Sequence, residues 1–504
     1  EKVIRRALVS VYHKEGLAEI LKLLHEQGVE FVSTGGTSTF IEGLGYPCVA
    51  VEDLTKYPSM LGGRVKTLHP AIQGGILARR GHETDQKEVL EYGLSLIDLV
   101  IVDLYPFEAT VASGASEEDI IEKIDIGGIS LIRGAAKNFE DVVIIPSQAD
   151  YATLLEILRE RGARTTLEER RHFARRAFAV SSHYDSAIFR YFDAEDHSAL
   201  RLTADEAKPL RYGENPHQKG VFYGDLDRYF EQLHGKELSY NNLQDVEAAV
   251  SLIQDFTEPT FAILKHNNAC GCASRPTLLE AWTDALAGDP VSAFGGVLVA
   301  NRPIDVATAR EIDKLFLEVL IAPDFEAEAL TILEGKKNRI LLRQKEAIDA
   351  RWSYRSMLGG VLAQETDRAV ETTAEMKPVT KVAPTAEELT DLVFATKLVK
   401  HSKSNAIVLS KGGQLIASGV GQTSRVDALK QAIEKARHFG FDLKGAVLAS
   451  DAFFPFDDCV TLAAEAGITA IAQPGGSVRD ADSIAAADRL GVAMVMTGVR
   501  HFKH

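Results

Sequence analysis

The chain has 504 residues, 45% of them hydrophobic and 25% charged, and its formal net charge is -16 at pH 7. This length predicts two or three domains with substantial cores. The composition is that of soluble globular proteins, which excludes disordered, collagen-like and fibrous chains. The acidic balance argues against nucleic-acid and anionic-membrane surfaces, because both normally need a net positive patch, although local clusters of Arg and Lys can still bind small anions.

Four cysteines are too few and too scattered to stabilise a chain of this length by disulfide bonds, which predicts a reducing, cytoplasmic compartment. Cys270 and Cys272 form the one close pair. A zinc site usually has at least two residues between paired cysteine ligands and a second ligand pair, so we expect no metal. The apolar runs are shorter than the roughly 18 residues of a membrane span and too short at the start for a signal peptide.

Residues 1–150 alternate between the periods of strands and helices. Strands are predicted at 7–11, 29–33, 99–102 and 142–145. The last two are continuous β-branched runs, typical of a parallel sheet that is covered on both faces. The pattern predicts an α/β layer, followed by a helical region at 151–192.

A polar stretch at 193–209 is typical of a linker, and we place the domain boundary there, giving domains 1–198 and 199–504. Beyond it, helices separate strands predicted at 261–264, 297–300, 406–409, 446–449 and 493–496. A second polar stretch divides this region near 365–385 into two α/β halves of similar plan. We detect no residue-level repeat between the halves.

Two glycine-containing segments near the start are candidate anion sites. Gly35 and Gly36 lie between a predicted strand and a helix start, where backbone N–H groups can hold a phosphate. A tight turn without a ligand is about as probable from these glycines alone. The loop 61–70 concentrates polar groups, including Arg64 and Lys66, between glycines and a proline, which favours a site over a merely solvated loop.

Tyr105 and Lys137 are ambiguous by themselves. Tyr105 follows the strand that ends at Asp103, and the carboxyl edge of an open sheet is where α/β folds bind ligands, but a core or capping tyrosine is equally compatible. Lys137 ends an apolar helix. It can extend to solvent, which is the commoner case, or lie in a cleft where desolvation lowers its pKa.

In the second region, the polar and conformationally restricted segment 211–218 favours a ligand-holding loop over a structural turn. Lys265 and His266 directly follow the strand at 261–264. An imidazole can act as a general base while a neighbouring ammonium stabilises an oxyanion. A Lys-His pair alone is weak support, because exposed strand ends often carry both.

Six ordered motifs together resemble the family of bifunctional purine biosynthesis proteins, in which AICAR transformylase is joined to IMP cyclohydrolase. They are Gly-Gly-Arg-Val-Lys-Thr-Leu-His-Pro, Ile-Asp-Ile-Gly-Gly, Arg-Tyr-Gly-Glu-Asn-Pro-His-Gln, Leu-Lys-His-Asn-Asn, Asp-Ala-Phe-Phe-Pro-Phe and the final Arg-His-Phe. The resemblance covers essentially the whole chain. It implies a methylglyoxal-synthase-like N-terminal domain and a C-terminal region of two cytidine-deaminase-like halves.

For the cyclohydrolase, the resemblance implies a site in which Asp125 receives the amide N–H, Lys137 transfers a proton, and Lys66 with Tyr105 stabilises an oxyanion. The nucleotide contacts it implies are Tyr12, His13, Lys14, Thr34, Gly35, Gly36, Thr37, Arg64, Val65, Thr67, Asp103 and Ile126. The reaction would be a tethered condensation, in which the carboxamide nitrogen of formyl-AICAR attacks the formyl carbon and water leaves.

For the transformylase, the resemblance implies His266 as the base towards the 5-amino group of AICAR and Lys265 as the stabilising cation, with 10-formyltetrahydrofolate as co-substrate. The implied ligand contacts are Arg211, Tyr212, Gly295, Glu318, Asn405, Arg425, Phe453 and Arg500. Glu318 occupies a position that can carry Asp in the family, which leaves its reach to the ribose open. The zinc-deaminase signature is missing, so zinc hydrolysis is not expected.

The resemblance also implies a homodimer with small-molecule substrates. A non-catalytic purine-nucleotide sensor is the rival interpretation, in which the N-terminal loops bind a ligand and the second region only responds. The Lys265-His266 pair and Lys137 favour catalysis.

Overall fold

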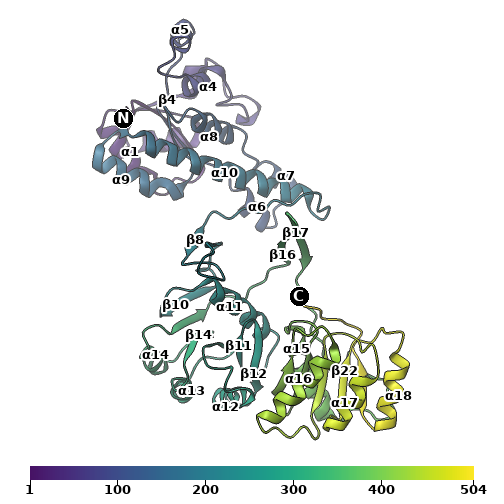
Figure 1. Cartoon of the computed structure of the whole chain (residues 1–504). Coiled ribbons are helices and arrows are strands. Elements are labelled where there is room, and N and C mark those ends of the chain that lie inside the picture. The colour runs from purple at the N-terminus through teal and green to yellow at the C-terminus, as the bar shows by residue number, and fades with distance from the viewer. The chain divides into compact units, whose positions relative to one another are not determined.

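The computed structural model describes all residues from 1 to 504 and divides into two compact units, Glu1–Asp205 and Glu206–His504. We describe each by itself (Figure 1). None of the helices combines the length and the apolar character that a membrane span requires.

The first unit is built on a parallel sheet in the order β4-β3-β2-β5-β6. Its strands are β1 (Lys2–Val3), β2 (Arg6–Val11), β3 (Glu30–Ser33), β4 (Cys48–Ala50), β5 (Leu99–Asp103), β6 (Val143–Ile145) and β7 (Arg164–Thr165), with β1 and β7 forming a separate antiparallel pair. Its helices are α1 (Leu17–Glu26), α2 (Gly35–Gly43), α3 (Val51–Thr55), α4 (Pro70–Leu77), α5 (Glu83–Glu91), α6 (Phe107–Ala112), α7 (Glu117–Ile121), α8 (Gly127–Lys137), α9 (Tyr151–Arg161) and α10 (Leu167–Asp193). The expected α/β layer is confirmed.

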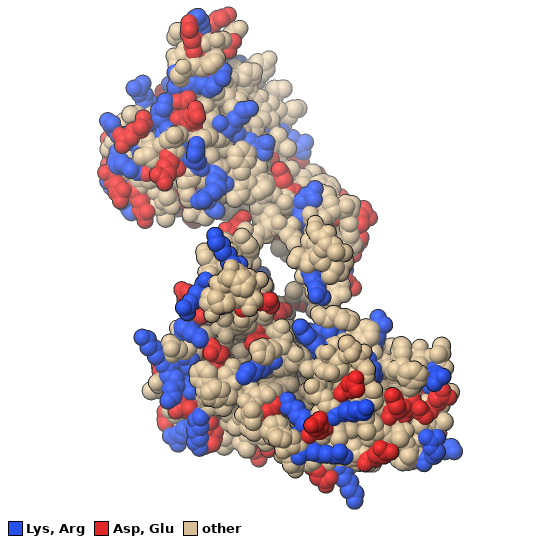
Figure 2. All heavy atoms as spheres, in the orientation of Figure 1, with Lys and Arg blue, Asp and Glu red and all other residues tan.

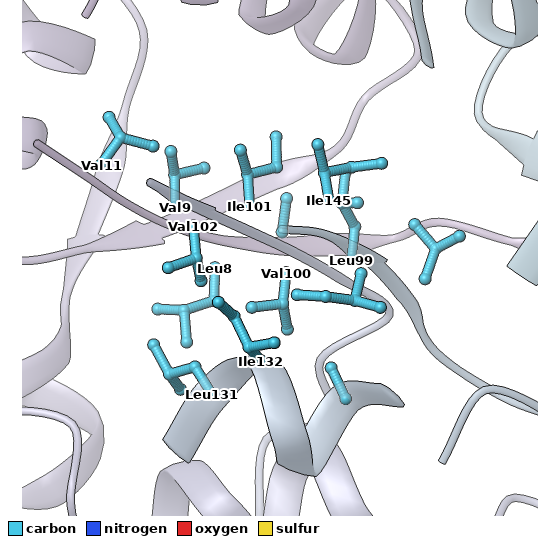
Figure 3. Packing of buried hydrophobic residues seen from close by; sticks show 14 of the residues in the cluster. Leu8, Val9, Val11, Leu99, Val100, Ile101, Val102, Leu131, Ile132 and Ile145 are labelled. Atoms are coloured by element: carbon cyan, nitrogen blue, oxygen red, sulfur yellow. The ribbon is translucent and has the colours of Figure 1, made fainter. Parts of the chain in front are cut away.

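Both faces of this sheet are buried, as the continuous apolar strands predict. Leu8 and Val100 point towards Leu131 and Ile132 of α8, whereas Val9 points to the opposite face (Figure 3). All five side chains are fully buried. The region at 151–192 is two helices rather than one, because Gly162 ends α9 with a positive φ of 65° and a short strand precedes the Thr166 capping box of α10.

The second unit is built on a mixed sheet of 12 strands, in the order β10-β15-β14-β13-β11-β12-β20-β19-β21-β22-β23-β18. Four further strands of this unit form two separate antiparallel pairs, β8 with β9 and β16 with β17. Its strands are β8 (Ala207–Leu210), β9 (Gly220–Tyr223), β10 (Phe230–His234), β11 (Thr260–Lys265), β12 (Asn268–Ser274), β13 (Gly296–Ala300), β14 (Leu317–Ala322), β15 (Ile340–Gln344), β16 (Trp352–Met357), β17 (Gly360–Glu365), β18 (Lys377–Pro378), β19 (Ile407–Lys411), β20 (Gln414–Gly419), β21 (Val447–Ser450), β22 (Ala470–Gln473) and β23 (Ala493–Met496). Its helices are α11 (Tyr240–Ile253), α12 (Leu278–Gly288), α13 (Val306–Ile312), α14 (Ala327–Leu333), α15 (Ala386–Lys400), α16 (Arg425–His438), α17 (Asp458–Ala466) and α18 (Asp480–Leu490).

The two halves of this sheet repeat one plan. Each runs helix, hairpin, helix, strand, helix, strand, helix, strand, starting at α11 in the first half and at α15 in the second. The halves join where Ala273 of β12 pairs with Gln414 of β20. One face of the joined sheet is buried under α11 and α15 in a single core, while α12 to α14 and α16 to α18 cover the other face in two separate cores.

Replacing Ile101 by Ala in the centre of the first sheet should lower the free energy of unfolding of the first unit by about 2–5 kcal/mol, because the side chain is fully buried and the cavity cannot collapse between two helix layers. Calorimetry of the full chain measures the shift. Leu90→Ala is the matched control, since Leu90 is 83% exposed and its loss should leave the transition within about 0.5 kcal/mol. Equal effects of both substitutions would contradict the packing described.

Candidate active sites

The first candidate site lies at the carboxyl ends of β2 and β5, where the strand order of the first sheet changes direction. After β2 the chain moves to β3 on one side, and β5 lies on the other side, which makes this the topological switch point. Asp103 at the end of β5 accepts hydrogen bonds from the His13 N–H at 2.7 Å and from His13 Nδ1 at 2.8 Å. The predicted contacts Tyr12, His13 and Asp103 are therefore brought together.

Asp125 is a carboxylate of this site that backbone N–H groups hold in place. It accepts the N–H groups of Gly128 at 2.6 Å and Tyr105 at 3.3 Å, while its own N–H donates to the Tyr184 hydroxyl at 3.1 Å. Burial, reinforced by Asp103, raises the pKa of Asp125 even though these N–H groups favour the carboxylate. Burial and Asp125 likewise raise the pKa of Tyr105.

Lys66 lies against two glycines that leave room for it. A Cβ on Gly63 would overlap Lys66 Cε, and a Cβ on Gly35 would lie 3.2 Å from its Nζ. Both glycines have positive φ, at 87° and 57°. The Lys66 ammonium thus lies beside the N-terminus of α2, where unpaired N–H groups and the helix dipole favour an anion.

Several other predicted contacts already have partners within the protein. The buried Thr37 hydroxyl donates to the Val11 carbonyl at 3.1 Å, and the Thr34 hydroxyl donates to Glu52 at 3.1 Å. Arg64 pairs with Glu122. Lys14 Nζ donates to the Val11 carbonyl at 2.6 Å, and burial lowers its pKa despite the proximity of Asp103.

The remaining predicted contacts lie around the starts of α4 and α8. Thr67 is buried, with its hydroxyl 3.0 Å from where a Cβ on Gly127 would stand. Ile126, just before α8, is 56% exposed. Val65 lines a pocket of about 250 Å³ together with Lys66.

Lys137 is not brought next to Asp125 within one chain. It is exposed at the last position of the 11-residue helix α8, about 15 Å along the axis from Gly127. Helix α4 runs beside α8 in the same direction, because Thr67 lies at the start of α8 and the Asn138 side chain donates to the Ile76 carbonyl at the other end at 2.8 Å. Both helices therefore present their N-termini, and not Lys137, to the site.

Two groups of side chains at this site were not predicted. Lys123 Nζ lies 5.1 Å from the ring centroid of Tyr12 and 5.8 Å from that of Tyr105, so a cation covers both phenol rings. Tyr57 and Met60 line the pocket beside Lys66. A lone lysine and two loop side chains carry no periodicity or motif, so the sequence gives no signal for them.

The second candidate site is the turn between β11 and β12. Lys265 pairs with Asn268 across the hairpin, which leaves His266 and Asn267 as the two turn residues, with φ of 51° and 66°. The His266 side chain is exposed, and Lys265 Nζ donates to the Phe294 carbonyl at 2.8 Å. Gly295 follows, with a φ of 73° and its N–H donating to the Phe316 carbonyl at 2.8 Å.

One predicted binding segment is bonded to helix α11, which holds this turn, and another is bonded to the hairpin itself. Glu214, in the loop that carries Arg211 and Tyr212, accepts hydrogen bonds from Asn241 and Gln244 at 3.2 Å each, at the start of α11. The Lys403 N–H donates to Asn268 Oδ1 at 3.1 Å, which places the neighbourhood of Asn405 beside the turn.

The other predicted contacts of this unit are held by internal partners. The buried Arg425 guanidinium pairs with Asp451 and donates to Asn405 Oδ1 at 2.7 Å. Glu318 pairs with Lys236 at 2.8 Å. Phe453 is 36% exposed, and Arg500 lies 4.3 Å above the Phe502 ring. Arg425 therefore positions Asn405 in this structure.

A buried ion triad anchors the segment around Arg500, and the sequence did not predict it. His501 is 3% exposed and lies 2.6 Å from Asp367 and 2.8 Å from Glu371. Burial alone would lower its pKa, but the two carboxylates raise the pKa of His501 to about 9. The His501 N–H also donates to the Asp451 carbonyl at 2.9 Å. Elsewhere, charges of both signs are interspersed over the visible surface (Figure 2).

Comparison with known proteins gives matches across the whole chain. A family model described as AICARFT/IMPCHase bienzyme matches residues 135–435, and one described as MGS-like domain matches residues 16–130. The chain belongs to the AICARFT/IMPCHase family. Two proteins described as bifunctional purine biosynthesis protein PurH are similar to it: that of Bacteroides thetaiotaomicron is 68% identical, covering 100% of this chain and 99% of its own, and that of Chloroflexus aurantiacus is 48% identical with the same coverage.

Family membership confirms the resemblance and the methylglyoxal-synthase-like parallel-sheet fold of the first unit. As a member, the chain is a bifunctional enzyme, an AICAR formyltransferase and IMP cyclohydrolase that performs the last two steps of IMP synthesis. The rival interpretation as a non-catalytic sensor has no support.

The His501 triad should make the stability of the second unit depend on pH. Because the folded pKa, about 9, is above the ordinary 6.5, the contribution is fully present below pH 6.5 and is lost as pH rises through 9. It amounts to at most about 3 kcal/mol. Urea unfolding followed by tryptophan fluorescence measures it, since both tryptophans, Trp282 and Trp352, are in this unit. His501→Gln should lack this dependence, and parallel pH profiles of the two proteins would contradict the triad.

Proposed function

We propose that the second unit transfers the formyl group and the first unit closes the ring. 10-Formyltetrahydrofolate serves as the donor. The 5-amino group of AICAR attacks the formyl carbon, the bond from that carbon to the folate nitrogen breaks, and formyl-AICAR and tetrahydrofolate are released. In the first unit the carboxamide nitrogen then attacks the formyl carbon and water leaves, giving IMP.

One observation carries the assignment of formyl transfer to the second unit: His266 stands at the tip of a hairpin with Lys265 beside it. The amine of AICAR is conjugated into the imidazole and is a poor nucleophile, so a positioned base is needed. His266 is exposed towards an incoming substrate and takes the amine proton, and Lys265 stabilises the oxyanion formed at the formyl carbon. Phe294 and Phe316, which are 59% and 52% exposed with ring centroids 5.0 Å apart, offer exposed aromatic side chains against which the folate ring can pack.

The ring closure is supported by the arrangement around Asp125 and Lys66. The start of α2 with the Lys66 ammonium suits the nucleotide phosphate or the developing oxyanion. Asp125, with its raised pKa and its place beside Tyr105, suits the amide N–H. Because both reacting groups belong to one molecule, holding the reactive rotamer supplies most of the acceleration.

His266→Ala should lower the rate of tetrahydrofolate formation from AICAR by about 100-fold or more, while IMP formation from added formyl-AICAR stays unchanged. Asp125→Asn should lower the rate of IMP formation from formyl-AICAR and leave the rate of tetrahydrofolate formation unchanged. Spectrophotometric assays of both half-reactions on each purified variant measure the split, and each variant is the folding control for the other. Loss of both activities in either variant, or of neither, would contradict the division between units.

Lys137→Ala tests whether this lysine takes part in ring closure although α8 separates it from Asp125. We expect the proton-transfer role implied by the family resemblance to appear as a fall of at least about tenfold in the rate of IMP formation from formyl-AICAR. Arg133→Ala, which removes another exposed cation from the same helix, is the matched control. Ring closure at the normal rate in Lys137→Ala would remove the assignment.

The homodimer and the cytoplasmic location stay predictions. Analytical ultracentrifugation of the purified chain tests the first.

A further inference from the structure

The hairpin that carries His266 has a counterpart in the other half of the second sheet. β11 and β12 are joined by His266 and Asn267, and β19 and β20 are joined by Gly412 and Gly413, with φ of 59° and 68°. Positive φ at both central residues makes each a type I′ turn. The lysines before the turns also correspond: Lys265 Nζ donates to the Phe294 carbonyl at 2.8 Å, and Lys411 Nζ to the Lys444 carbonyl at 2.6 Å.

An aspartate stands at the same position of the helix that precedes each hairpin. Asp245 is the sixth residue of α11 and Asp391 is the sixth residue of α15. The two oxygens of Asp391 accept the N–H groups of Gly412 and Gly413, each at 2.8 Å. At this turn, which has no histidine, both carboxylate oxygens are therefore engaged in holding the backbone.

Asp245 holds its turn differently. Its Oδ1 accepts the Asn267 N–H at 2.8 Å and, with the Asn267 amide nitrogen turned towards α11, that nitrogen at 3.0 Å. Both bonds go to one oxygen, so the carboxylate is not divided between two turn N–H groups as in Asp391. The hydrogen bond from the Asn267 N–H places the Asp245 carboxylate beside the residue that follows His266. Burial raises the pKa of Asp245, and the charge of His266 opposes this effect.

The first turn is also strained where the second is not. A left-handed conformation is unfavourable for a residue with a Cβ, less so for asparagine, and glycine does not bear this cost. His266 and Asn267 both bear it. The surrounding structure must offset that cost. The bonds from Asn267 to Asp245, together with the bond from the Asn267 amide nitrogen to the Gln244 carbonyl at 3.1 Å, fix the turn to α11.

We propose that Asp245 is a positioning residue for formyl transfer: it holds the strained turn that presents His266 and, as a neighbouring negative charge, strengthens the imidazole as a base. The inference rests on the proposed role of His266. The charged groups around the turn are Lys265 on its own strand, Asp245 from α11 and Lys403, whose N–H donates to Asn268 Oδ1. Asp245 is the anion among them.

Asp245→Asn tests the proposal, because the amide keeps an acceptor oxygen for Asn267 and removes only the charge. We expect the kcat of formyl transfer to fall about tenfold while the KM for AICAR stays within about twofold. The acidic limb of the pH profile of kcat/KM should move to lower pH, since the variant lacks the negative charge beside the turn. Ring closure of formyl-AICAR by the same protein should not change.

Asp391→Asn is the matched control at the equivalent position of the other half. It should weaken the second unit in urea unfolding and leave the acidic limb of formyl transfer where it is. The double variant Asp245→Asn with Asn267→Gly covers the case in which the single variant folds poorly, because glycine removes the strain at that position. We expect the double variant to regain stability but to keep the displaced limb.

An acidic limb that is unmoved in Asp245→Asn, or that returns to its normal place in the double variant, would overturn the proposal and leave Asp245 a structural residue only. His266→Ala in the same assay distinguishes failure of the proposed base from failure of the proposed positioning residue. Full formyl-transfer activity of His266→Ala would rule out His266 as the base. An inactive His266→Ala variant, together with an unchanged acidic limb in Asp245→Asn, would rule out only the positioning role of Asp245.

Discussion

A sheet that is covered on both faces leaves its strand ends as the places where side chains can meet a ligand. In the first unit, β2 and β5 are buried along their length, and Tyr12, Asp103 and Tyr105 come where they end. In the second unit, residues of β11 are buried until Lys265, and His266 is exposed one residue later. The candidate site residues thus lie at sheet edges and turns, and burial on both faces of the sheet holds the backbone there in one position.

The second unit shows how one plan serves two purposes. Both halves carry an aspartate on the covering helix, a lysine at the end of the first hairpin strand and a type I′ turn. In one half the turn residues are glycines, and the aspartate binds both of their N–H groups. In the other half a histidine and an asparagine take their place. The frame is the same, and the two halves differ here in the two turn residues and in the partners of one carboxylate.

Much of this could be predicted from the sequence. The apolar runs at 99–102 and 142–145 are strands, the glycines at 35 and 36 begin a helix, and Lys265 with His266 follows a strand. Strands such as β12 and β20 were missed, because Asn268-Ala-Cys-Gly-Cys and Gln414-Leu-Ile-Ala-Ser lack the long β-branched runs of their neighbours. Their positions follow from hairpin pairing and not from composition.

The site residues that escaped prediction share a physical reason. Asp245, Lys123 and the partners of His501 act through contacts between residues far apart in the chain, which no local pattern records. The position of Lys137 is the opposite case. A motif indicates its residue type, but only the length of α8 shows how far it lies from Asp125.

The two-glycine turn between β19 and β20 also has a use for protein engineering. Like the His266 turn, it has two residues with positive φ and is held by an aspartate of the preceding helix. Its two glycines could be replaced by residues with side chains without redesigning the scaffold. An imidazole grafted there would arrive beside a carboxylate whose oxygens are already engaged. Such a graft would show how an imidazole behaves beside a carboxylate that is hydrogen-bonded through both of its oxygens.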